Sequence, residues 1–293
     1  EQSVAKHADL TALRFATITM TYRELWGRVL RCAAALAALG VGKGDRVALM
    51  LPNCPQYVIA YFGTLRAGGI VVQVSPLSTP RELVHHLTTS GAETIIVADM
   101  LYPVVQAVLP QVNLTNVLVT RLRGEVTPGP EARAFEEVLM GTTGAPPDVQ
   151  VTPDDVAVLQ YTGGTTGIAK GAMLTHRNLV VNVLQTAATN PDFPSGADLR
   201  VLTVLPLFHV CGMTVCMNLG LARGGELILV PRFEPAEVLE TIKATQPTSF
   251  PGVPTMYVAI NSVPNAEEYG VGSIRFCNSG GAPMPLEVME SFE

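Results

Sequence analysis

The sequence predicts an α/β protein in which mostly parallel sheets are covered by helices. Helical stretches with N-cap signals alternate along the chain with short runs of Val, Ile and Leu. Continuous apolar runs of this kind are typical of parallel strands that are buried on both faces. Hydrophobic residues make up 48% of the 293 residues and charged residues only 15%, which indicates a large interior.

The first half of the chain supplies clear element boundaries. A capping box at Thr21 predicts a helix that stops before Gly40. A second capping box at Thr79 predicts a helix that ends near Gly91. The remaining elements expected in this half are strands at 46–51, 70–74, 94–98 and 117–119 and a helix over 55–67.

The second half repeats the alternation after a connector. Residues 124–153 are rich in Pro, Gly and charge, so we expect a linking segment with a short helix at 135–139. We therefore divide the chain into a first α/β subdomain, 1–150, and a second, 151–293. The second is expected to hold strands at 155–161, 171–174, 201–205, 226–230, 248–250 and 274–277, and helices from 175, near 210–222, at 235–244 and from 254.

Composition excludes several classes of protein. A net charge of −6 without any Lys/Arg run argues against a nucleic-acid-binding surface. Five widely spaced cysteines without a C-x-x-C pair argue against disulfides and zinc, so we expect reduced thiols and a cytoplasmic location. Residues 1–7 show no signal-peptide core. Residues 201–222 lack charge, but their polar and Gly/Pro breaks predict a strand and a buried helix rather than a membrane span.

The most informative segment is residues 161–171, which read Y-T-G-G-T-T-G-I-A-K-G. Glycines let the backbone approach a ligand, consecutive N–H groups can form an anion nest, and Lys170 adds a mobile cation. The common nucleotide loop has Gly before its Lys and a helix after it, whereas here Ala169 precedes the Lys and a strand pattern follows. We predict a hairpin-like loop that wraps a polyphosphate, the alternative being a plain surface turn.

Three segments together carry a resemblance to a known family. The loop, with residues 174–179 after it, resembles the phosphate-binding signature of the AMP-forming adenylating superfamily, which includes acyl-CoA synthetases, luciferases and peptide-synthetase adenylation domains. Residues 205–210 resemble the segment that lines the carboxylate-substrate pocket, and residues 278–284 resemble the loop that packs against adenine. A milder likeness begins at Met20. The resemblance implies the large N-terminal domain of such enzymes.

The resemblance also implies a site and its chemistry. Catalytic roles fall to Lys170 and to His209, whose N–H would stabilise the attacking carboxylate. By itself, His209 in an apolar stretch would be interpreted as a core histidine bonded to a backbone carbonyl. ATP, coenzyme A and Mg²⁺ are implied, with Thr162 as the metal contact. The nucleotide-binding residues are Thr162, Gly163, Gly164, Thr165, Thr166, Gly167, Lys170, Gly280, Gly281, Ala282 and Pro283.

The other polar groups are predicted to be structural. His176 opens a helix and is expected to bond to backbone near the loop. His85 and His86 are adjacent on a helix, so they face different ways and are expected at the surface. Asp154 and Asp155 are expected to be a solvated pair.

The substrate class follows from one position. The peptide-synthetase branch typically has Phe-Asp where this chain has Phe208 and His209, and an amino-acid ammonium needs a carboxylate partner. We therefore expect an apolar carboxylic acid, a fatty acid above all, as the partner of ATP and coenzyme A. Ala169 stands where the family commonly has proline. Two alternatives remain: a non-catalytic nucleotide-binding module, and an enzyme that loads a carrier-protein thiol.

Several parts of the resembled family have no counterpart before Glu293, namely the Mg²⁺-binding Glu segment, the ribose-binding Asp and the mobile C-terminal domain with its catalytic Lys. We infer a fragment that binds nucleotide weakly and does not turn over alone. The expected assembly to test is a homodimer.

Overall fold

The computed structural model describes residues 1–122, 124, 129–162, 169–190 and 192–292, and the chain forms two compact units. Unit 1 comprises Glu1–Leu25, Asn53–Pro55 and Asn182–Glu293. Unit 2 comprises Trp26–Pro52 and Gln56–Val181. This division differs from the predicted boundary between 150 and 151. The N-terminal strands join the sheet of the later residues, and the strands that flank the phosphate loop join the sheet of the earlier ones.

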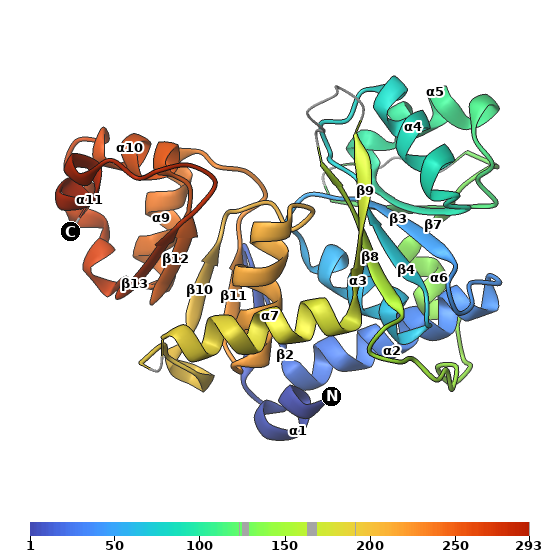
Figure 1. Ribbon diagram of the computed structural model, residues 1–293, viewed down its shortest axis with the longest axis horizontal. Coiled ribbons are helices and arrows are strands. Elements are labelled where there is room, and N and C mark those ends of the chain that lie inside the picture. The colour runs from blue at the N-terminus through green and yellow to red at the C-terminus, as the bar shows by residue number, and fades with distance from the viewer. Residues whose placement is uncertain (123, 125–128, 163–168, 191, 293) are drawn as a thin grey trace. The chain divides into compact units, whose positions relative to one another are not determined.

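Unit 2 is built on a seven-stranded sheet of order β7-β6-β5-β3-β4-β8-β9 (Figure 1). All neighbours are parallel except β8 and β9, which form an antiparallel pair. The strands are β3 (Arg46–Met50), β4 (Ile70–Gln73), β5 (Thr94–Ala98), β6 (Asn116–Thr120), β7 (Arg133–Ala134), β8 (Val156–Thr162) and β9 (Lys170–Thr175). The helices are α2 (Tyr22–Ala38), α3 (Pro55–Arg66), α4 (Pro80–Ser90), α5 (Tyr102–Val108) and α6 (Phe135–Gly141), with short 3₁₀ turns η1 (Asp99–Leu101) and η2 (Leu109–Gln111).

Unit 1 contains a six-stranded sheet of order β13-β12-β10-β11-β1-β2, in which only β1 and β2 are antiparallel. The strands are β1 (Thr11–Phe15), β2 (Ile18–Thr21), β10 (Arg200–Thr203), β11 (Glu226–Leu229), β12 (Ser249–Gly252) and β13 (Phe276–Ser279). The helices are α1 (Gln2–His7), α7 (His176–Thr189, which starts in unit 2), a π-helix η4 (Gly212–Asn218), α8 (Leu219–Ala222), α9 (Pro235–Thr245), α10 (Pro254–Asn261) and α11 (Leu286–Phe292), with 3₁₀ turns η3 (Gly196–Asp198), η5 (Ala266–Tyr269) and η6 (Val271–Ser273).

Each unit has its own hydrophobic core. In unit 2, apolar side chains of β3, β4, β5 and β6 pack against α4 and α5, and all five residues of β5 are buried. In unit 1, β10, β11 and β12 pack against α9 and α10 around Phe250 and Tyr257. Burial on this scale is what the continuous Val, Ile and Leu runs of the sequence predicted. The predicted α/β class with mostly parallel sheets is confirmed.

The predicted helix caps are confirmed in atomic detail. Thr79 accepts a hydrogen bond from the backbone N–H of Glu82, whose carboxylate accepts from the N–H of Thr79. Thr21 and Glu24 form the same reciprocal pair before α2. Because a capping box needs only a four-residue stretch, it can be predicted locally.

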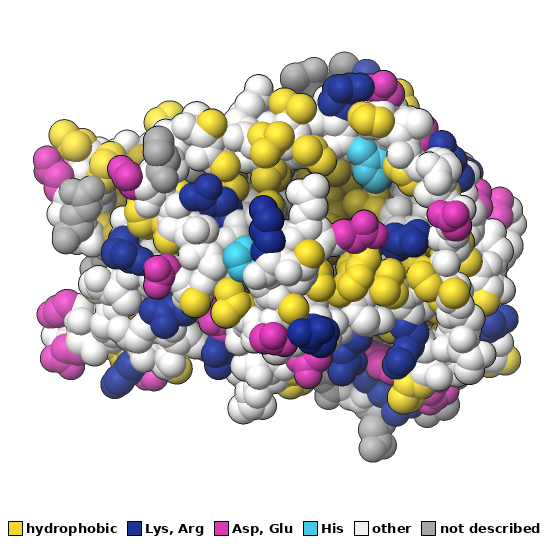
Figure 2. All heavy atoms as spheres, turned by 90° about the horizontal axis from the view of Figure 1, so that it is seen from below, with side chains coloured by type: hydrophobic (Ala, Val, Ile, Leu, Met, Phe, Trp, Pro, Cys, Tyr) yellow, Lys and Arg dark blue, Asp and Glu magenta, His cyan; other side chains and the backbone are white. Residues whose placement is uncertain are grey.

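Other elements differ from the prediction. The elements α1, β1, β2 and α5 were not expected, and the helix expected near 210–222 begins as a π-helix. The uncharged stretch 201–222 is divided between β10, a loop and two helical segments. Within the described residues, none of the helices combines the length and the apolar character that a membrane crossing requires. On the face shown in Figure 2, acidic and basic side chains are interspersed.

Candidate functional site

In unit 1, the two predicted site segments follow the carboxyl ends of parallel strands in one sheet, and a third segment follows the strand between them. The segment with His209 follows β10, Val253 follows β12, and the glycines at 280 and 281 follow β13. Open parallel sheets bind their ligands at this edge, because the loops there converge. The structure therefore brings the predicted acid-side and adenine-side segments of unit 1 to one edge of one sheet.

The segment before His209 is held by a buried amide. Asn53 Nδ2 donates to the carbonyl oxygens of Thr203 and Leu205, both at 3.0 Å. The backbone N–H of Leu207 donates to Asn53 Oδ1 at 2.8 Å. Asn53 is only 2% exposed, so these bonds form away from water, where an unpaired donor or acceptor is costly. The amide thus fixes the path of the chain as it leaves β10.

His209 itself is exposed and oriented by backbone. The N–H of Cys211 donates to His209 Nδ1 at 3.3 Å. Since a neutral imidazole carries one proton, this contact leaves the proton on Nε2 as a free donor. This exposed ring differs from the core histidine bonded to a backbone carbonyl that the apolar stretch alone would suggest. Burial raises the pKa of the Cys216 thiol in the helix that follows, so this thiol stays protonated.

A glycine allows the turn after His209 to form. A Cβ atom on Gly212 would lie 2.2 Å from the carbonyl oxygen of Pro206 and 2.8 Å from that of Leu205. Both are backbone atoms that cannot move aside without shifting the segment. Gly212 also begins the π-helix η4, a rare geometry found frequently at functional sites.

The loop after β13 contains the predicted adenine-side residues. Gly280 N donates to Gly252 O at 3.1 Å, which ties the loop to β12. Gly281 has φ of 80°, a conformation that favours glycine. Gly281, Ala282 and Pro283 are exposed. A Cβ atom at Gly280 would meet its nearest neighbour, Cys211 Sγ, at 3.7 Å, so the protein itself leaves room there.

In unit 2, the predicted hairpin around the phosphate loop is confirmed. Strands β8 and β9 pair antiparallel, and Thr162 lies opposite Lys170 at the open end. Both side chains are exposed. The predicted residues Gly163, Gly164, Thr165, Thr166 and Gly167 lie outside the described residues. A hydroxyl and an ammonium are thus placed side by side at the ends of two strands that enclose the loop.

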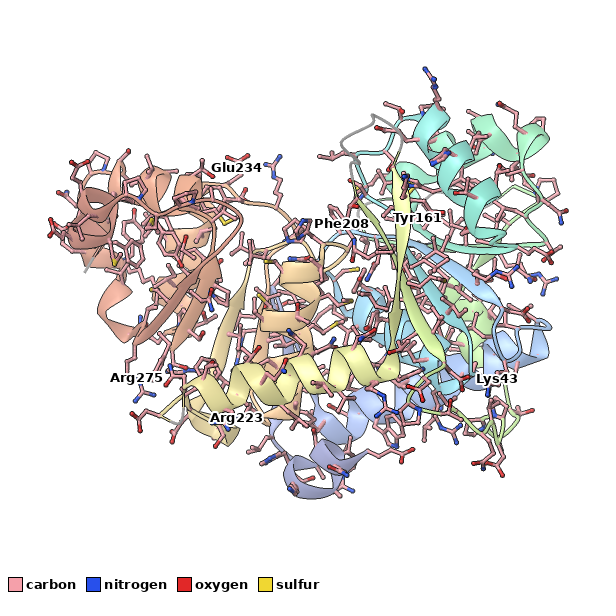
Figure 3. The ribbon with its side chains drawn as sticks, in the orientation of Figure 1. Lys43, Tyr161, Phe208, Arg223, Glu234 and Arg275 are labelled. Carbon is pink, nitrogen blue, oxygen red and sulfur yellow. The ribbon has the colours of Figure 1, made fainter. Side chains whose placement is uncertain are left out.

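Helix α4 packs on this hairpin, which the sequence did not suggest. Tyr161 lies near the end of β8 (Figure 3). The ring centroid of His86, which is only 8% exposed, lies 4.2 Å from that of Tyr161. Burial, followed by the charge of His85, lowers the pKa of His86. His85 Nε2 lies 2.7 Å from the carbonyl oxygen of Ala169. The prediction that both histidines are surface residues is wrong for His86, which is buried, whereas His85 is half-buried.

The remaining predicted polar groups have structural partners. His176 N–H donates to the carbonyl oxygen of Asp155, consistent with a structural position at the start of α7. Asp155 pairs with Lys43 at 2.8 Å, and Asp154 with Arg177 at 2.8 Å. The expected solvated acidic pair is therefore two exposed ion pairs. Such pairs contribute little to stability.

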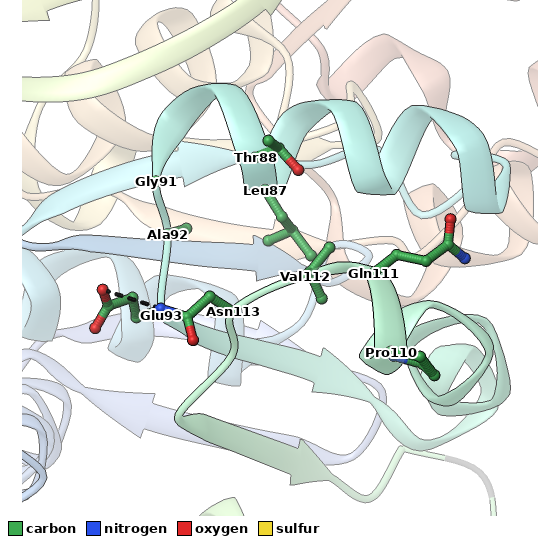
Figure 4. A pocket seen from close by; sticks show the side chains of 9 residues that line it. All are labelled: Leu87, Thr88, Gly91, Ala92, Glu93, Pro110, Gln111, Val112 and Asn113. Atoms are coloured by element: carbon green, nitrogen blue, oxygen red, sulfur yellow. Dashed lines mark hydrogen bonds between the residues drawn. The ribbon is translucent and has the colours of Figure 1, made fainter.

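A separate hollow of about 400 Å³ lies in unit 2, at the end of α4 (Figure 4). Its described lining comes from two segments, 87–93 and 110–113, and includes none of the predicted site residues. The positions of the exposed polar groups, rather than this hollow, therefore define the candidate site. Among the described residues, no three His, Cys, Asp or Glu side chains are grouped to hold a metal.

Comparison with known proteins identifies the family of the chain. The whole chain, residues 1–293, matches the family described as AMP-binding enzyme. The chain belongs to the AMP-binding enzyme family.

Several curated relatives of this family member are CoA ligases. The chain is 39% identical to the long-chain-fatty-acid–CoA ligase of Bacillus subtilis (strain 168), over 99% of this chain and 56% of the relative. It is 34% identical to 4-coumarate–CoA ligase 1 of Arabidopsis thaliana, over 92% of this chain and 49% of the relative. The chain therefore spans about half the length of the curated relatives it matches.

Solved structures of the family share the fold. The N-terminal domain of FACL13 from Mycobacterium tuberculosis superimposes with a TM-score of 0.85 at 27% identity, covering 99% of this chain and 71% of that one. A long-chain-fatty-acid-CoA ligase, FadD1, from Archaeoglobus fulgidus gives 0.86 at 28% identity, covering 99% and 58%. The fold implied by the sequence resemblance, the large N-terminal domain of acyl-CoA ligase-like adenylating enzymes, is thereby confirmed.

Sequence reasoning did not foresee the contacts that three residues make around these segments. Asn53 acts on a segment 150 residues away, and His85 and Tyr161 meet across two elements. A signal existed only for Asn53, since an Asn that follows a buried strand and precedes Cys54 is a polar residue in an apolar setting.

Proposed function

We propose that the full-length protein uses ATP to activate a fatty acid as acyl-AMP and then transfers the acyl group to coenzyme A. The observation that carries the proposal is the His209 imidazole at the sheet edge, with Nε2–H free to donate and with Met213, Cys216 and Val210 as apolar neighbours in sequence. Membership of the AMP-binding enzyme family and the printed names of the ligase relatives support it.

The first step proposed is attack by a carboxylate oxygen on the α-phosphorus of ATP, which expels pyrophosphate and forms a mixed anhydride. His209 Nε2–H would donate to the carboxylate and hold it for in-line attack. The anhydride makes the carboxyl carbon electrophilic. In the second step the thiol of coenzyme A attacks that carbon, and AMP leaves.

Phosphate binding is assigned to the open end of the hairpin. Lys170 would neutralise the β- and γ-phosphates, because its exposed ammonium stands beside the loop that follows Thr162. Residues 163–167 would add backbone N–H groups and hydroxyls, as their composition predicts. The exposed Thr162 hydroxyl fits Mg²⁺, which takes oxygen ligands and is commonly shared with substrate phosphates. The ion would supply positive charge there.

Adenine binding is assigned to the loop after β13. The conformation of Gly281 and the space at Gly280 leave a surface without side chains on which a flat ring can lie. Ala282 and Pro283 complete this exposed stretch.

A fatty acid is preferred to an amino acid because His209 stands where an acidic partner for an ammonium would be needed. A cytoplasmic location is proposed on the five cysteines, all of which are free thiols. A homodimer is proposed as the assembly, to be tested by light scattering.

The test is ATP–pyrophosphate exchange by the full-length protein, with fatty acids of several lengths, aryl acids and amino acids offered in turn. Exchange that depends on an apolar acid supports the proposal. ATP binding without exchange for any acid favours the non-catalytic nucleotide-binding module. Exchange followed by acyl transfer to a phosphopantetheine carrier, but not to coenzyme A, favours the carrier-loading enzyme.

A further inference from the structure

Helix α4 contacts both strands of the β8–β9 hairpin at the points where they enter and leave the phosphate loop. On the β9 side, His85 Nε2 lies 2.7 Å from the carbonyl oxygen of Ala169. On the β8 side, the hydroxyl of Tyr161 lies 2.6 Å from Thr89 Oγ1. Two residues of one helix, four positions apart, therefore hold two strand ends that are eight residues apart in sequence.

The contact from His85 has a defined direction. A carbonyl oxygen can only accept, so His85 Nε2 carries a proton and donates it to Ala169. Thr89 Oγ1 donates to the carbonyl oxygen of His85 at 2.7 Å, and the Tyr161 hydroxyl shares its proton between Thr89 Oγ1 at 2.6 Å and the carbonyl oxygen of His86 at 3.2 Å. The result is a connected chain of hydrogen bonds from Tyr161 through Thr89 to the backbone of His85.

The hydrogen bond from His85 to the Ala169 carbonyl affects Lys170 through the planar peptide group between Ala169 and Lys170. The Ala169 carbonyl and the Lys170 N–H belong to one planar peptide group. Holding the carbonyl fixes the orientation of that plane, and with it the direction in which the Lys170 Cα leaves the loop. Alanine places no ring restraint on φ as proline does, so the hydrogen bond from His85 adds a backbone restraint that the residue itself lacks.

Packing reinforces the other side of the hairpin. The Tyr161 ring lies over its cross-strand partner, Gly171, where a Cβ atom would come within 3.2 Å of the ring. The Tyr161 ring also meets the buried ring of His86. Tyr161 is thereby confined, so the hairpin has a fixed support against which the His85 bond can act.

We propose that His85 is a positioning residue for Lys170: its Nε2–H···O bond to Ala169 sets the loop lysine in place for the phosphates of ATP. This inference rests on the proposed function, because it assumes that Lys170 meets those phosphates. It predicts that substitution of His85 changes the affinity for ATP and does not change the affinity for the carboxylic acid.

The test compares two amides that differ by one methylene in the full-length protein. The amide nitrogen of His85→Gln reaches the place of Nε2, whereas that of His85→Asn falls short of it. His85→Asn should raise the KM for ATP about five- to tenfold, the equivalent of one hydrogen bond, and leave the KM for the acid unchanged. His85→Gln should restore the KM for ATP to within about twofold of the native value. Thr88→Ala, on the exposed side of α4, is the control and should match the native protein.

The outcomes separate this inference from the proposed function. An unchanged KM for ATP in His85→Asn, or equal defects in His85→Asn and His85→Gln, overturns the role of His85 while exchange itself stands. A lower kcat with both KM values unchanged points to a structural role and also overturns it. If the native protein exchanges with no acid, the proposed function fails, and calorimetric ATP titration of the same variants then tests His85 directly. No ATP binding by the native protein overturns both.

Discussion

The two parts of the candidate site are supported in different ways. The His209 segment of unit 1 is held by Asn53, a 2%-exposed amide with backbone partners on both its nitrogen and its oxygen. Lys170 of unit 2 lies at the exposed start of β9, and the residue before it, Ala169, accepts a hydrogen bond from His85 of α4. Buried hydrogen bonds cannot be exchanged for water, whereas those near the surface can. Substitutions that disturb the Asn53-supported segment should therefore lower the free energy of unfolding. Substitutions at Lys170 should instead lower the affinity for ATP.

The largest effect expected is that of Asn53→Leu. Leucine keeps the volume but leaves the Leu207 N–H and the carbonyls of Thr203 and Leu205 without their partner. We expect the free energy of unfolding to fall by about 4 kcal/mol, as several buried groups lose their bonds. Urea unfolding measures this loss. Asn261→Ala removes a single bond, to Val288, and as a control should cost only about 1 kcal/mol. Equal losses would contradict the special role of Asn53.

Lys170→Ala tests the other side of the comparison. Because Lys170 is exposed, the free energy of unfolding should change by less than about 0.5 kcal/mol. ATP–pyrophosphate exchange at ATP concentrations well below KM should nevertheless fall about 100-fold through a higher KM for ATP, since the cation proposed to bind the β- and γ-phosphates is lost. Lys6→Ala, on an exposed part of α1, should leave the rate of exchange unchanged. Native-like exchange by Lys170→Ala would remove the phosphate role from this residue.

A pair of glycines sharpens the comparison within unit 1. Gly212→Ala forces a Cβ atom to 2.2 Å from a backbone oxygen and should lower the free energy of unfolding by about 2 kcal/mol. Gly280→Ala makes only an ordinary contact at 3.7 Å, so stability should change by less than about 0.5 kcal/mol. The KM for ATP should rise in Gly280→Ala if adenine lies against that glycine. Urea unfolding and exchange kinetics measure both effects, and a stability loss at Gly280 equal to that at Gly212 would refute the difference.

The smallest effect concerns pH and unit 2. Burial lowers the pKa of His86 and of His176 below the ordinary 6.5, so the unfolded chain takes up protons first as the pH falls. Stability should therefore be full above about pH 6.5 and decline on acidification below it. His86→Phe should flatten this decline in part, leaving the share of His176. Urea unfolding at pH 7.5 and 5.5 provides the test, because Asp155, with a pKa lowered to about 2 chiefly by its hydrogen bond from Lys43, titrates well below that window. An unchanged slope in His86→Phe would show that His86 makes no contribution.

The local features of this chain were predictable from short stretches of sequence. The caps at Thr21 and Thr79, the buried run of β5 and the hairpin that encloses the loop each depend on a few neighbouring residues. The short strands β1 and β2 were missed because their apolar pattern is brief and because β1 pairs with β11, more than 200 residues away.

The sequence by itself determined the α/β class, most of the helix and strand positions, and the family signatures that lead to Lys170, His209 and the residue 280–283 loop. Only the tertiary structure decided which strands share a sheet, which unit holds each signature, and that Asn53 and His85 act on segments 84 to 154 residues away. The physical reason is that capping and periodicity are properties of neighbouring residues. A hydrogen bond between distant segments exists only once the packing within a unit has brought its two atoms together.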